Sequence, residues 1–245
     1  MWVIQPAGKS RIDALCDPVV VSVTVLDQEM YTEAEAARLL AVPPTTLNYW
    51  LEGGERRGKL YEPIVREARK GGHPPVTWAE FVECAWLRQY RRKHQVPMKE
   101  LRAFITQLRD KLGVPYPLAH ARAFAYAGKL LIVEAQEVAG LDPEYYLVAP
   151  VGGQMLLTPP AEEYHERLQY EDDIVAAWRP HDDPNSSVLI RPNVRFGRPS
   201  VAGISTDVLW EQVDAGASID EVAMDFGITP RDVRWAVSYE SARAA

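Results

Sequence analysis

Residues 31–50 constrain the fold of this chain more than any other stretch, because they encode two short helices across a tight turn. Thr32 with Glu35 three residues later is a capping box, which satisfies two free N–H groups at a helix start. Pro43 and Pro44 cannot continue that helix, but Pro44 suits the first position of a second one. Two short helices joined in this way predict a helix-turn-helix, whose second helix can enter the major groove of DNA.

The charge of the chain is unevenly distributed. Its net charge of −7 at pH 7 argues by itself against a nucleic-acid-binding protein. Residues 30–112, however, carry 15 basic and 10 acidic groups, whereas residues 205–245 carry 3 basic and 8 acidic groups. Positive charge therefore coincides with the predicted helix-turn-helix, as attraction to phosphates requires. The alternative is a solvated basic face without a nucleic-acid partner.

A basic segment with three glycines, residues 52–61, follows the second helix. Glycines permit a tight reversal, and arginine and lysine side chains meet phosphates. Residues 31–61 resemble the MerR-type winged helix-turn-helix. The resemblance lies in the order of the parts, which are Tyr-Thr, an Ala-rich helix, a Val-centred turn and Thr-Leu before an aromatic residue. The segment 52–61 would be the wing. The family often has a basic residue where Asn48 stands, and Asn can pair with adenine instead. The resemblance implies these DNA-binding residues: Arg38, Thr45, Thr46, Asn48, Tyr49, Arg56, Arg57 and Lys59.

Two further helices are predicted before residue 113. A second capping box, Thr77 to Glu80, opens a helix with a wide apolar stripe. The basic residues 88–93 in its last turn either complement the helix dipole or contact phosphate. Apolar residues at a 3-4 spacing along 98–112 suit either core packing or a dimer seam.

The middle of the chain, residues 113–190, changes to patterns typical of strands. Two hairpins are predicted over 123–134 and 145–157, a short helix after residue 158, and strands at 174–178 and 188–190. No phosphate-binding glycine loop, metal motif or nucleophile–base pair is present, so we expect neither enzymatic activity nor a cofactor.

The last 55 residues, 191–245, predict a compact three-helix domain. Ser205, Ser218 and Thr229 each stand at a helix start, and Gly216 and Gly227 follow the ends of the first two helices. Arg-Pro at 198–199, the segment 215–227 and Tyr-Glu at 239–240 resemble a small family of three-helix domains associated with antitoxins of VapBC-type toxin–antitoxin pairs.

This second resemblance implies a function. A chain of this kind is expected to neutralise a cognate toxin, a metal-dependent ribonuclease with a PIN-domain fold, and to repress their shared promoter by binding operator DNA. The alternative is a stand-alone transcriptional regulator that binds a small ligand in the middle domain, with Tyr164, Tyr170 and Trp178 lining the pocket.

A toxin-binding surface is predicted where arginines enter the acidic half of the chain. Arginine pairs well with the metal-binding carboxylates of a nuclease, and arginine with aromatic residues is typical of interface cores. The alternative is a linker whose arginines pair with nearby acidic groups. The predicted toxin-binding residues are Arg191, Arg195, Phe196 and Arg198.

The sequence thus predicts an α+β protein with four parts. Residues 1–29 are an N-terminal extension containing an edge strand over 19–25. Residues 30–96 are the winged helix-turn-helix, 97–190 a central domain, and 191–245 the three-helix domain. The two cysteines form no disulfide framework and no apolar run is long enough to span a membrane, so we expect a cytoplasmic protein. A homodimer is expected because such proteins pair two half-sites, with 98–112 and the hairpins of 123–157 as candidate seams.

Overall fold

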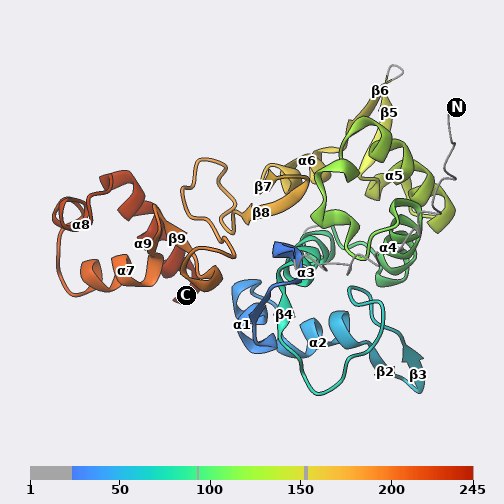
Figure 1. The fold of residues 1–245 in the computed structure, drawn as a ribbon, viewed down its shortest axis with the longest axis horizontal. Helices are drawn as coiled ribbons and strands as arrows, with labels where there is room; N and C mark the ends of the chain where they lie inside the picture. Colours follow the sequence, from blue (N-terminus) through green and yellow to red (C-terminus); the bar gives the residue numbers. More distant parts are fainter. Residues whose placement is uncertain (1–23, 93, 152–153, 245) are drawn as a thin grey trace, which may run out of the picture.

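The computed structural model describes residues 24–92, 94–151 and 154–244, and it confirms the α+β class. Helices α7–α9 form one group, and the elements from α1 to β8 form a larger group beside it (Figure 1). The helices are α1 (Glu33–Leu39), α2 (Pro44–Glu52), α3 (Trp78–Arg92), α4 (Met98–Leu112), α5 (Tyr126–Ala139), α6 (Pro159–His165), α7 (Thr206–Asp214), α8 (Ile219–Phe226) and α9 (Pro230–Ala244).

The strands of the described residues pair in five separate antiparallel hairpins or ribbons of two strands each. The pairs are β1 (Glu29–Tyr31) with β4 (Val76–Thr77), β2 (Gly54–Arg56) with β3 (Lys59–Tyr61), β5 (Val148–Val151) with β6 (Gln154–Leu157), β7 (Leu168–Glu171) with β8 (Ile174–Trp178), and β9 (Ser200–Val201) with β10 (Ile204–Ser205).

The predicted helix pair is present as α1 and α2, and the hairpin β2–β3 follows it. Glu35 N donates to Thr32 Oγ1 at 3.2 Å, and Thr32 N donates to Glu35 Oε2 at 2.9 Å, so the capping box has formed. Gly53 ends α2 with φ +71, and a Cβ there would lie 2.2 Å from the Tyr61 carbonyl oxygen. Only glycine therefore allows the hairpin to leave the helix in this direction.

Helix α3 is the centre of the larger group, and most of its side chains are buried. Phe81 packs on Tyr31 with ring centroids 4.9 Å apart and on Trp178 at 5.4 Å. Trp78 Nε1 donates to the Val175 carbonyl at 2.6 Å. Residues on both sides of position 97 consequently share one hydrophobic cluster, which runs from Leu26 to Ile190. The domain boundaries proposed above stay predictions.

The hairpin predicted over residues 123–134 is wrong, because this stretch enters helix α5. Gly128 does not form a turn; a Cβ there would lie 2.0 Å from the Arg122 carbonyl oxygen, so it allows a close backbone approach. Ile132 and Ala135 are buried at helical spacing in the pair that α5 forms with α4. This packing overrides the β propensity of the local sequence. The second predicted hairpin is confirmed as β5–β6.

Other predictions need smaller corrections. The stripe of 98–112 is core: Leu101, Ile105 and Leu108 are at most 1% exposed, so they do not form a dimer seam. Residues 188–190 form isolated bridges instead of a strand. The edge strand expected over 19–25 falls mostly outside the described residues, and Val25 begins a 3₁₀ turn, Val25–Asp27.

The three C-terminal helices are confirmed and have a hydrophobic cluster of their own. Ser218 and Glu221 form a capping box at the start of α8, and Gly227 ends that helix in the left-handed conformation. The cluster consists of Val188, Val201, Leu209, Val222, Ala223, Val233, Ala236 and Tyr239. Across the described part of the chain, no helix combines the length and apolar character that crossing a membrane would need.

Candidate functional sites

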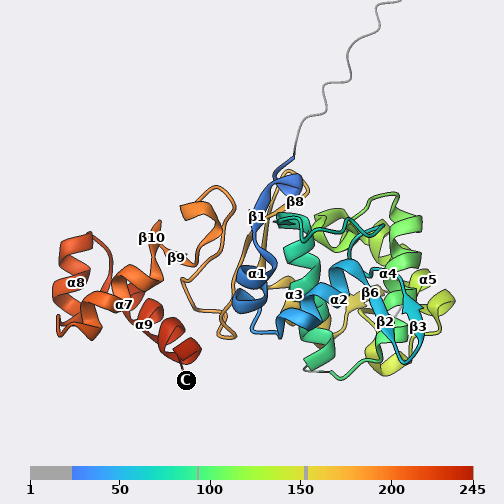
Figure 2. The ribbon, with the colours of Figure 1, turned by 90° about the horizontal axis from the view of Figure 1, so that it is seen from below.

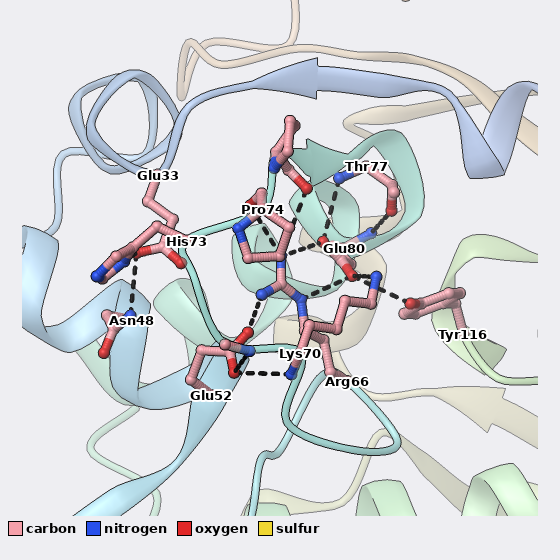
Figure 3. A network of polar contacts seen from close by, with 12 residues as sticks. Glu33, Asn48, Glu52, Arg66, Lys70, His73, Pro74, Thr77, Glu80 and Tyr116 are labelled. Atoms are coloured by element: carbon pink, nitrogen blue, oxygen red, sulfur yellow. Dashed lines mark hydrogen bonds and ion pairs between the residues drawn. The ribbon is translucent and has the colours of Figure 1, made fainter.

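The outer surface of α2 carries part of the predicted DNA-binding set. Thr45 is exposed and Thr46 is half-buried near the start of the helix. Asn48 is also half-buried, and its Nδ2 donates to Glu33 Oε2 at 3.0 Å (Figure 3). His73 Nδ1 lies 3.0 Å from the same Glu33 oxygen. Asn48 must therefore leave this contact, or turn its amide oxygen outward, before it can pair with a base.

The hairpin β2–β3 carries the basic residues predicted for the wing. Tyr49 is only 8% exposed, and the Arg56 guanidinium carbon lies 3.9 Å from its ring centroid. Arg102 Nη2 donates to the Tyr49 hydroxyl at 3.3 Å. The buried Tyr49 ring thus packs against the hairpin through Arg56. Arg56, Arg57 and Lys59 remain exposed for contact with a ligand.

A buried ionic network fixes α2 relative to α3 (Figure 3). Arg66 is 1% exposed; its Nε and Nη2 donate to the two oxygens of Glu80 at 2.9 Å each, and its Nη1 donates to Glu52. Lys70 Nζ donates to Glu80 Oε1 at 2.9 Å. Glu52 ends α2 and Glu80 lies in the first turn of α3, so the loop 62–75 joins the two helices through charge-assisted bonds.

Carboxylates along α3 titrate differently because their partners differ. Burial opposes ionisation of Glu80, but the hydrogen bonds from Arg66 and Lys70 hold its pKa below the usual value. Burial raises the pKa of Glu83 to about 8, although Arg109 and the Leu118 amide oppose that rise. Glu83 Oε2 is buried without a hydrogen-bond partner.

The predicted toxin-binding residues lie on the segment that precedes β9. Arg195, Phe196 and Gly197 all have positive φ, at +49, +54 and +72. This backbone, named the 195–198 turn below, holds the Phe196 side chain 89% exposed. Arg195 Nε donates to the Gly203 carbonyl at 2.8 Å, and Arg191 instead donates to Gln169 Oε1 at 2.9 Å. The structure brings Arg195, Phe196 and Arg198 together and places Arg191 apart from them.

A cleft of about 1020 Å³ separates α1 from the C-terminal helices. Arg38, predicted to bind DNA, lines this cleft together with the 195–198 turn. Its other charged residues outside the 195–198 turn come from distant segments of the chain, and no sequence spacing predicted that they would meet. These residues are Glu35, Asp207, Glu240 and Arg243.

The aromatic residues expected to line a ligand pocket are core residues. Tyr164 is 1% exposed and its hydroxyl donates to the Val82 carbonyl at 2.9 Å, while Trp178 is 2% exposed. Tyr170 packs with its ring centroid 5.5 Å from that of His165. Over residues 24–92, 94–151 and 154–244, no group of three or more His, Cys, Asp or Glu side chains is arranged to hold a metal ion.

Known proteins resemble this chain in its C-terminal part and in its whole fold. The family model described as "Protein of unknown function (DUF433)" matches residues 188–239, which span the C-terminal cluster. The crystal structure of Rv2018 from Mycobacterium tuberculosis superimposes with a TM-score of 0.69 at 25% identity, covering 86% of this chain and 99% of that one.

Two curated proteins of Mycobacterium tuberculosis are similar over most of their length. The one named "Putative antitoxin VapB45" is 29% identical over 223 residues, which cover 85% of this chain and 92% of the relative. The one named "Uncharacterized protein Rv2308" is 32% identical over 232 residues, which cover 89% of this chain and 93% of the relative. Because this identity extends over nearly the whole of both chains, the protein belongs to the same family as Rv2308.

Proposed function

We propose that this chain is an antitoxin that binds a cognate PIN-domain ribonuclease toxin and represses the promoter they share. The similarity to a relative named as an antitoxin over 85% of this chain supports the antitoxin role. The observation that carries toxin binding is the 195–198 turn, which holds Phe196 89% exposed between Arg195 and Arg198. An exposed aromatic residue flanked by arginines is typical of an interface hot spot.

The proposed DNA-binding surface is the outer side of α2 with the hairpin β2–β3. A MerR-like docking would place Thr45, Thr46 and Asn48 at the major groove, with the wing residues Arg56 and Arg57 at the backbone. The two proposed surfaces do not overlap, since α1 and α2 lie between the hairpin β2–β3 and β9, the strand that follows the 195–198 turn (Figure 2). Each chain of a homodimer on two half-sites can therefore hold DNA and toxin simultaneously.

The test of the antitoxin role is co-expression of the full chain with the product of the neighbouring gene. We expect the wild-type chain to co-purify with that protein and to restore growth of cells that express it. Arg195→Glu combined with Arg198→Glu should abolish both effects, because two charges that pair with carboxylates become repulsive. A doubly reversed variant that is folded and still protects the cells would exclude this turn as the inhibitory surface.

A further inference from the structure

Two arginines line the cleft between α1 and the C-terminal helices without pairing directly with a carboxylate of the described residues. Arg38 comes from α1 and Arg198 from the 195–198 turn, and both side chains are exposed. Neither side chain forms a hydrogen bond or an ion pair with another described residue. Both lie near the Glu35 carboxylate, whose pKa is lowered chiefly by hydrogen bonds from Thr32 and further by these two arginines. The cleft therefore brings two free cations from distant parts of the chain to one place.

The other charged side chains of the cleft already have partners. None of their contacts involves Arg38 or Arg198, so none of these groups neutralises either arginine by direct pairing. The contacts are Arg243 to Glu240 at 3.0 Å, Arg195 Nε to the Gly203 carbonyl at 2.8 Å, the Val208 amide to Asp207 at 2.8 Å, and the Thr32 amide to Glu35 at 2.9 Å.

The cleft also has an apolar part. Phe196 is 89% exposed and Val208 is 39% exposed, and both line the cleft beside Leu39 and Trp210. A ligand that covers these side chains needs a bulky apolar group as well as anionic groups. The cleft carboxylates Glu35, Asp207 and Glu240 would repel a continuous row of phosphates. This combination favours a peptide with separate carboxylates over a nucleic acid.

We propose that this cleft binds a peptide segment of the toxin that carries Asp or Glu side chains beside a bulky apolar one. Arg38 and Arg198 pair with the carboxylates, and the apolar side chain packs against Phe196 and Val208. This inference rests on the proposed function, but it extends the toxin site from the 195–198 turn to α1. It also assigns Arg38 to the protein partner, where the sequence assigned it to DNA.

The first test is charge reversal at Arg38 in the full chain, measured as affinity for the co-expressed toxin. Arg38→Glu should weaken binding by more than about tenfold, since like charges would then meet in the cleft. The matched control is Arg234→Glu, which reverses an exposed arginine of α9 that does not line the cleft. The control should leave the affinity unchanged, and circular dichroism should show both variants folded.

The second test is a photo-crosslinking amino acid placed at Val208 within the cleft or at Met224, which is 78% exposed on α8. Irradiation of the toxin complex should give an adduct from position 208 only, and mass spectrometry should identify a toxin peptide containing Asp or Glu.

Three results would overturn the cleft site while the antitoxin role stands: wild-type toxin affinity in Arg38→Glu, an adduct from position 224 alone, or a crosslinked peptide without a carboxylate. Loss of promoter DNA binding by Arg38→Glu with unchanged toxin affinity would assign Arg38 to nucleic acid and would also overturn it. Failure of the wild-type chain to capture the neighbouring gene product would reject both proposals.

Discussion

The Tyr31 hydroxyl donates a hydrogen bond of 2.7 Å to the carbonyl oxygen of Gly197, 166 positions later in the chain. Tyr31 ends β1 just before α1, and Gly197 lies at the centre of the 195–198 turn. The start of the helix pair and the proposed toxin-binding turn are therefore in direct contact. Any displacement of the turn must break this bond or move the residues that precede α1.

Replacing Gly197 with alanine should destabilise the protein more than the cost of placing alanine at a positive φ, because the new Cβ would also clash with Tyr31. A Cβ on Gly197 would lie 2.3 Å from the Tyr31 hydroxyl oxygen, at φ +72. Gly203 has a similar φ of +81 with nothing within 4 Å, so Gly203→Ala is the matched control for backbone strain. We expect Gly203→Ala to lower the free energy of unfolding by about 1 kcal/mol and Gly197→Ala to lower it clearly further. Urea unfolding measures both, and equal losses would contradict the steric role of Gly197.

Removing the Arg66 guanidinium should strongly destabilise the larger helical group. Arg66→Met leaves the carboxylates of Glu52 and Glu80 without their shared cation, which typically costs about 3–5 kcal/mol for a buried pair. Lys111→Met is the control, because Lys111 pairs with the exposed Glu134 at 2.7 Å and such surface pairs contribute about 0–1 kcal/mol. Thermal and urea unfolding compare the two, and losses of similar size would show that the network does not stabilise the fold.

Glu83 should make the protein less stable as the pH rises. Its folded pKa of about 8 lies above the ordinary glutamate value of 4.5, so the unfolded chain loses the proton first. The free energy of unfolding therefore falls between about pH 4.5 and 8, by up to ~1.4 kcal/mol per pH unit. Glu83→Gln should remove this pH dependence. The difference in free energy of unfolding between the variant and the wild type should therefore increase from pH 4.5 to 8. A gap that is constant from pH 5 to 8 would contradict the raised pKa.

The wing arginines should contribute to DNA affinity without reading sequence. Arg56→Ala with Arg57→Ala should weaken binding to the promoter and to unrelated DNA alike. The slope of log K against log salt should become shallower by about 2, since each lost phosphate contact removes ~0.9. Arg234→Ala, on α9, is the control and should leave the slope unchanged. Equal slopes in the wing variant and the wild type would place the phosphate contacts elsewhere.

Local signals predicted the parts of the fold that depend on neighbouring residues. The capping boxes at Thr32, Thr77 and Ser218 form as expected, because a side chain and an amide three residues apart meet only at a helix start. The hairpin β2–β3 also forms where the glycine-containing segment 52–61 predicted a reversal, and Arg57 and Gly58, both at positive φ, make its turn.

Long-range packing decided the parts that the sequence did not predict. Residues 129–134 contain good strand formers, yet burial of Ile132 against α4 makes them helical. In the sequence, nothing distinguishes Arg66 from other arginines of the loop 62–75, but the fold buries it between Glu52 and Glu80. Arg38 and Arg198 line the same cleft although they are 160 positions apart in the sequence. No periodicity of the sequence could predict a contact over that separation.

The backbone of the 195–198 turn has a consequence for how the protein behaves in solution without a partner. The Phe196 side chain is almost fully exposed to water. Phe196 and Arg195 both have a positive φ, which residues other than glycine rarely adopt. Together with Val208, which is 39% exposed in the same cleft, the Phe196 ring forms an apolar surface that promotes self-association whenever nothing covers it. The isolated chain should therefore lose solubility at lower concentrations than its complex with the toxin, and Phe196→Ser should raise that limit.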